Sequence, residues 1–195
     1  MRAKSLFLFA LIFLSVTTTS LYSQGTAEAM PTPMSDPNEG IWKGYDGELR
    51  YVTRLLVSLA EAIPAEKYAW RPAPGVRSVS EVYMHIVIAN YYLLTPMGSK
   101  MPAELMAPGA EAKIASKVEV IDWLKRSLEA VKTGRMGLKP GELARKVNIE
   151  GESADVDGMY LRIICHNNEH LGQLIAYARS NGVVPPWSAA GSAKP

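Results

Sequence analysis

The sequence predicts an all-α protein, a four-helix bundle that follows an N-terminal signal peptide. Four segments carry apolar residues at helical spacing, proline or glycine follows each of them, and no segment has a convincing sheet pattern. The chain has 195 residues, which suggests one domain, and 48% of them are hydrophobic, which is enough to form a core.

The first residues have the layout of a secretory signal peptide. Arg2 and Lys4 precede an uncharged apolar run from Leu6 to Leu14, and small or polar residues follow up to Ser23. The run is too short to cross a bilayer, which takes about 20 residues. We therefore predict cleavage after Ser23 and an exported protein, periplasmic or extracellular, with no stable membrane insertion after cleavage. The alternative is an N-terminal anchor that is never cleaved.

Composition divides the rest of the chain. Residues 24–38 are rich in proline, threonine, alanine and serine and are predicted to be a flexible leader; residues 39–187 form the bundle and residues 188–195 a flexible tail. Without Arg2 and Lys4 the 21 basic residues fall to 19, equal to the 19 acidic ones. This balance, with no basic cluster, excludes nucleic acid as an expected partner.

The first predicted helix runs from Glu39 to Ile63 and ends at Pro64. Its apolar residues are separated by three and four positions in turn, so they form one stripe that can pack against a partner helix. They are Trp42, Tyr45, Leu49, Val52, Leu56, Leu59 and Ile63.

The second helix begins after Ser78 and continues to about Leu94. Ser78 and Glu81 have the spacing of a capping box, in which each side chain satisfies a free backbone N–H of the other residue. The predicted core face contains Val82, His85, Ala89 and Tyr92. Residues 95–113 read as a long loop.

A second capping box, Ser116 with Glu119, starts the third helix, and Gly134 and Gly137 are predicted to lie beyond its end. Its apolar stripe contains Val118, Ile121, Leu124, Leu128 and Val131. Residues 138–152 indicate either a short extended piece or a hairpin. The fourth helix runs from about Asp155 to Asn181. Physical arguments alone leave the order of helices in the bundle open.

All three histidines of the chain lie on predicted inward faces. His166 and His170 are four residues apart, so they share one face of the fourth helix and can reach one cation. His85 comes from the second helix. Three neutral imidazoles suit zinc or nickel best, with iron, copper or manganese as alternatives, and three protein ligands leave positions open. The other interpretation is a bundle whose histidines hold no metal.

Two segments resemble the DinB-like superfamily of metal-binding four-helix bundles, which includes the bacillithiol transferases. They are SVSEVYMHIVIANYYLL, residues 78–94, and HNNEHLGQLIAYARSNGVVPP, residues 166–186. The family pattern has one histidine on the second helix and a His-x-x-x-His pair on the fourth, followed by Gly-Gln and a closing Asn-Gly with prolines. His85, His166 and His170 match these positions, and the resemblance covers roughly residues 39–187.

The resemblance implies a bundle with a long crossover connection and frequently a homodimer. Some relatives are transferases or isomerases that use bacillithiol or mycothiol, with the metal thought to hold the thiolate; many others have no known reaction. Those thiols are cytoplasmic, whereas this chain is predicted to be exported. The predicted export therefore argues against bacillithiol or mycothiol as the substrate of this protein.

Two functions remain open on the sequence. One is a metal-dependent transferase or hydrolase acting on a small molecule; the other is a non-catalytic metal-binding or stress-associated module. Glu169, about 60° from His166 around the helix, is the candidate general base or partner of a histidine, against the alternative of a solvated carboxylate. Cys165, the only cysteine, is either a small buried residue or a metal ligand or reactive thiol. Trp70 and Arg71 are candidates to cover the site.

Overall fold

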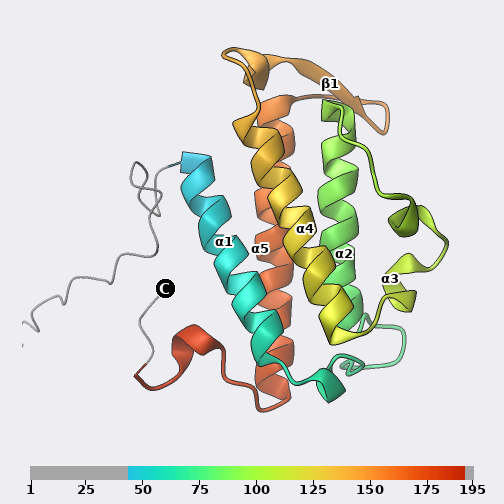
Figure 1. The fold of residues 1–195 in the computed structure, drawn as a ribbon, viewed down its shortest axis with the longest axis vertical. Helices are drawn as coiled ribbons and strands as arrows, with labels where there is room; N and C mark the ends of the chain where they lie inside the picture. The colour runs from blue at the N-terminus through green and yellow to red at the C-terminus, as the bar shows by residue number, and fades with distance from the viewer. Residues whose placement is uncertain (1–43, 192–195) are drawn as a thin grey trace, which may run out of the picture.

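Four long helices pack side by side in the computed structural model of the chain (Figure 1). The structure describes residues 44–191. The predicted signal peptide, the leader and the start of the first helix, including Trp42, lie outside these residues. The long helices are α1 (Gly44–Ala62), α2 (Val79–Leu94), α4 (Lys117–Met136) and α5 (Val156–Ser180).

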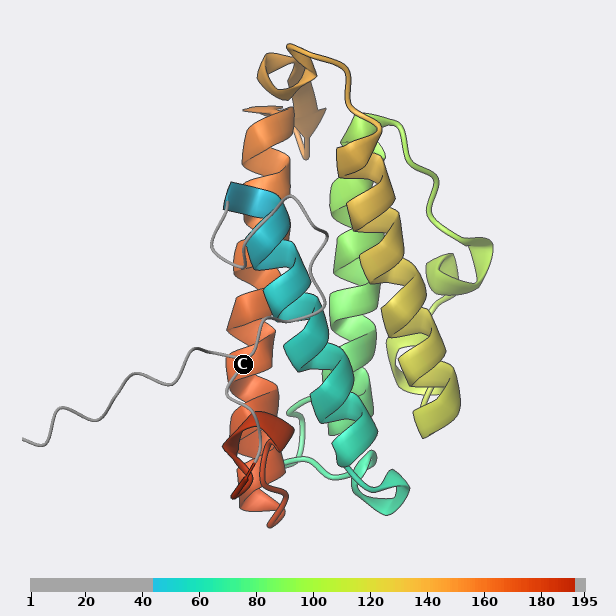
Figure 2. The same cartoon turned by 60° about the vertical axis from the view of Figure 1, so that its left-hand side comes forward.

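The bundle has a long crossover. α1 and α2 each pack against both α4 and α5, and α1 and α5 run in one direction while α2 and α4 run in the other (Figures 1 and 2). Because α2 and α4 are parallel, the segment between them runs back along the bundle. It contains the short helices η2 (Thr95–Met97), η3 (Ala103–Met106) and α3 (Ala110–Lys113), and α3 packs against α2. The predicted crossover is confirmed, but the predicted loop is partly helical.

The helix starts follow the capping residues of the sequence. Ser78 and Glu81 form the complete capping box. Ser116 accepts a hydrogen bond from the backbone N–H of Glu119, but the carboxylate of Glu119 faces the Ser116 hydroxyl at 3.5 Å, so the second predicted box is only half formed. Asp155 caps α5 by accepting from the backbone N–H of Gly158 at 2.8 Å.

The face of α1 that packs into the core is the one that the sequence predicted. The residues of its stripe that are buried are Leu49, Val52, Leu56, Leu59 and, just past the helix end, Ile63. These side chains meet those of α4 and α5 in one continuous hydrophobic core.

The predicted face of α2 is wrong in part. Ala89 is only partly buried and Tyr92 is exposed. Because α2 contacts α4, α5 and α3, it is buried on most of its circumference, and one stripe cannot describe it. Its buried apolar residues are Val79, Val82, Tyr83, Met84, Ile86, Val87, Tyr91, Leu93 and Leu94.

Two predictions for α4 also need correction. Val118 is 82% exposed, in the first turn of the helix, and Val120 and Trp123 take its place in the core. Gly134 lies inside α4 and not beyond it, while Gly137 is the C-cap.

A β-hairpin joins α4 to α5. After a 3-10 turn η4 (Glu142–Ala144), the strands β1 (Lys146–Ile149) and β2 (Glu152–Asp155) pair antiparallel. The turn places Glu150 and Gly151 at positive φ, the conformation that glycine adopts without strain. Of the two predicted interpretations, the hairpin is confirmed.

Two short 3-10 helices complete the described chain, η1 (Ala65–Lys67) after α1 and η5 (Pro186–Ser188) after α5. η5 packs against α1, so the residues at the end of the predicted bundle, near position 187, still contact its first helix. Across residues 44–191, no helix has the length and apolar character that a membrane span requires.

Candidate metal centre

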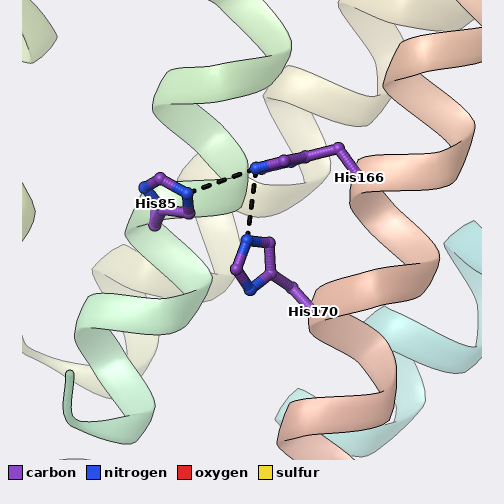
Figure 3. Close-up of side chains that lie close together, drawn as sticks. All are labelled: His85, His166 and His170. Atoms are coloured by element: carbon purple, nitrogen blue, oxygen red, sulfur yellow. Dashed lines mark hydrogen bonds between the residues drawn. The ribbon is translucent and has the colours of Figure 1, made fainter. Parts of the chain in front are cut away.

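The three histidines meet between α2 and α5. These helices are neighbours, and His85 projects from α2 toward His166 and His170, which project from consecutive turns of α5 (Figure 3). All three side chains are partly buried. The convergence that the spacing predicted is therefore present.

The Nε2 atoms point at one another. That of His166 lies 3.2 Å from the Nε2 of His85 and 3.2 Å from the Nε2 of His170. One ligand atom from each of the three residues lies within 4.8 Å of the others. Two nitrogens held about 2.0–2.1 Å from one tetrahedral ion are about 3.3 Å apart. The spacing of these rings therefore fits a shared divalent ion.

The outer ring nitrogens differ in their surroundings. His85 Nδ1 lies 3.3 Å from Oε2 of Glu111 on α3, and His170 Nδ1 lies 2.8 Å from Oε1 of Gln173. His166 Nδ1 is buried and has no hydrogen-bond partner among the described residues. Two of the three rings are thus oriented by a second side chain, as is common for histidines that bind metals.

The surroundings of His166 and His85 lower the pKa of both rings and so favour their neutral form. Burial, together with the neighbouring His170, His85 and Arg162, lowers the pKa of His166 to about 4, although Glu169 opposes the shift. Burial also lowers the pKa of His85, with Arg77 and His170 acting in the same direction. A neutral imidazole is the form that binds a metal ion.

The structure does not bring Glu169 into the histidine cluster. Both oxygens of its exposed carboxylate accept hydrogen bonds from Arg162, at 2.9 and 2.7 Å. Hydrogen bonding from Arg162 lowers the pKa of Glu169. Cys165 is exposed, so it is not the small buried residue of one interpretation, and it is not a member of the cluster.

Two residues that sequence reasoning missed lie beside His85. Glu111 contacts His85 and also pairs with the guanidinium group of Arg77. Arg77 lies in a loop and Glu111 in the four-residue helix α3, which is too short for a periodic pattern to place a residue relative to the bundle. Of the two candidates to cover the site, Trp70 packs edge-on against Tyr177, whereas Arg71 pairs with Glu81.

Fold and site together define a class: a helical bundle with a long crossover, whose histidines from two neighbouring helices form a cluster able to bind metal. The model of the DinB superfamily matches residues 48–174. The chain therefore belongs to the DinB superfamily.

Solved structures agree with this fold. A DinB-like protein from Bacillus cereus ATCC 10987 is 21% identical, with 72% of this chain and 95% of that chain covered and a TM-score of 0.61. A DinB-like protein from Bacillus subtilis, YjoA, is 15% identical, with 72% and 93% covered and a TM-score of 0.53. Among curated proteins, no significant match was found.

Proposed function

We propose that this protein is an exported member of the DinB superfamily that binds one divalent metal ion through His85, His166 and His170. The observation that carries the proposal is the convergence of three Nε2 atoms from two helices. The donor set, three neutral imidazoles without a carboxylate or thiolate, favours zinc or nickel; iron, copper or manganese are the alternatives.

The proposed activity is that of a metal-dependent transferase or hydrolase acting on a small molecule. When bound, a metal with open positions supplies a Lewis acid that lowers the pKa of a water or thiol. The residues of the chain aim the three imidazoles at one point and favour the neutral form of His85 and His166. The side chain of His85 is 26% exposed, so a ligand can approach from solvent.

A specific observation supports the second candidate, a non-catalytic metal-binding or stress-associated module. The Glu169 carboxylate is engaged by Arg162, and the Glu111 carboxylate is engaged by Arg77 and His85. Within the described residues, the cluster contains no carboxylate free to act as a general base. Turnover by the metal-loaded protein, compared with the metal-free protein, separates the two candidates.

The metal site is tested by elemental analysis of protein purified from its own compartment. The parent should carry one equivalent of a transition metal, and a variant with all three histidines changed to alanine should carry none. Equal metal content in both proteins would contradict the site. Circular dichroism of the variant shows whether it has kept its helices.

Export is proposed from the sequence of residues 1–23. N-terminal sequencing of the exported protein should begin near Gln24, whereas Met1 retained in the membrane fraction would indicate an anchor. The homodimer implied by the family resemblance is tested by sedimentation of the purified protein.

A further inference from the structure

The position of the proton on each imidazole decides which of its two nitrogens can bind a metal. A neutral ring has one N–H and one lone pair. A ring that binds through Nε2 must therefore carry its proton on Nδ1. A partner at Nδ1 that can only accept a hydrogen bond selects this tautomer.

Glu111 is such a partner for His85. An ionised carboxylate has no hydrogen to donate, and Oε2 of Glu111 lies 3.3 Å from Nδ1 of His85. Arg77 contacts both oxygens of the same carboxylate, which holds the group in place. Glu111 comes from α3, so the crossover segment contributes directly to the site.

Gln173 has the corresponding place beside His170, and its direction is set by Tyr177. An amide can accept or donate, depending on which end faces the ring. Nε2 of Gln173 donates to the Tyr177 hydroxyl at 2.9 Å, which leaves Oε1 to face His170 Nδ1 at 2.8 Å. Trp70 packs edge-on against Tyr177, with ring centroids 5.2 Å apart.

We propose that Glu111 and Gln173 are positioning residues, which hold His85 and His170 in the Nδ1–H tautomer with both Nε2 lone pairs aimed at the convergence point before a metal arrives. The inference rests on the proposed metal site. It assigns a role to α3 and to the Gln173–Tyr177 pair, and it leaves His166 as the ring without such a partner.

The direct test is nuclear magnetic resonance of the metal-free protein labelled with ¹⁵N-histidine. Long-range ¹⁵N–¹H correlations distinguish a protonated Nδ1 from a protonated Nε2. In the parent, His85 and His170 should both be protonated at Nδ1. Glu111→Ala should convert His85 to a mixture of tautomers, and Gln173→Met should do the same to His170, each without affecting the other ring.

Zinc titration supplies the second measurement. Glu111→Ala and Gln173→Met should each weaken zinc binding about 10–100-fold, the usual effect of removing such a partner. Glu111→Gln keeps the size of the side chain, but Arg77 can only donate and would hold the amide oxygen, which turns the amide NH2 group toward Nδ1 of His85. This variant should therefore favour protonation of His85 at Nε2 and weaken zinc binding. Glu104→Ala is the matched control, because Glu104 is an exposed acid on the same crossover; it should bind zinc like the parent.

Two results would overturn the inference: protonation of His85 and His170 at Nε2 in the parent, or unchanged tautomers in both variants. Thermal unfolding of each variant shows whether a loss of zinc affinity reflects a loss of fold. A parent with the expected tautomers that binds no zinc would contradict the proposed function while supporting the positioning of the two rings. The two failures are therefore distinguishable.

Discussion

Gly134 of α4 faces the hydroxyl group of Tyr160 in α5. A Cβ atom at Gly134 would lie 2.9 Å from that oxygen, closer than side chains normally approach. Tyr160 is itself buried, with its ring edge-on to Tyr45 at 5.4 Å, so it has little freedom to move away. The absence of a side chain at Gly134 therefore permits this close approach.

We expect Gly134→Ala to destabilise the protein, although alanine is favoured over glycine inside a helix by about 1 kcal/mol. The clash with Tyr160 should outweigh that gain. Gly172→Ala in α5 is the control, because nothing lies within 4 Å of the added Cβ, and it should stabilise the fold. Urea denaturation measures the free energy of unfolding of both variants. If both were stabilised equally, the Tyr160 side chain would have moved away from the added Cβ at little cost.

Leu56→Asp should lower the free energy of unfolding by more than about 3 kcal/mol, because it removes a fully buried side chain and leaves an unpaired charge in its place. Val118→Asp makes the same kind of change at a residue that is 82% exposed, and it should cost less than about 0.5 kcal/mol. Thermal melting compares them. A large loss at Val118 would contradict the position of the first turn of α4.

His170→Ala should remove most of the zinc affinity, since it takes away one of three converging nitrogens. Cys165→Ala should bind like the parent, because the thiol is exposed and is not part of the cluster. Calorimetric titration of the metal-free proteins measures both affinities. If only Cys165→Ala lost zinc affinity, the Cys165 thiol and not the histidine cluster would be the metal ligand.

The metal-free protein should lose stability as the pH falls from about 6.5 toward 4. The pKa of His166 in the fold is about 4, below the usual value of about 6.5. In this range the unfolded chain binds a proton that the folded chain does not, so unfolding becomes easier; above it both forms are neutral. The lowered pKa of His85 acts in the same direction.

Urea midpoints at pH 7.5 and pH 4.5 measure this effect. His166→Gln removes one titrating ring, so the variant should lose less stability than the parent between the two pH values. The same loss in both proteins would show that His166 does not contribute to the acid sensitivity.

The sequence predicted those features that depend on local spacing. The Ser78 cap, the extent of α5 and the shared face of His166 and His170 follow from short-range rules. The approach of His85 was predicted only because its helix was expected to turn that residue inward in a bundle. The inner face of α2 could not be predicted from one stripe, because three elements cover it. Glu111 was missed because its segment has no periodicity, and Gly134 was misplaced because its role depends on Tyr160, which is distant in sequence.

The separation of the ligands along the chain has a consequence for metal loading. His85 and His166 are 81 residues apart, and α5 follows the other three described long helices in the chain, so it is synthesised after them. Until α5 docks on α2, the chain offers only the local pair His166 and His170 to a metal. Tight binding and completion of the tertiary fold must therefore occur together, and a chain truncated before α5 would be unable to assemble the site.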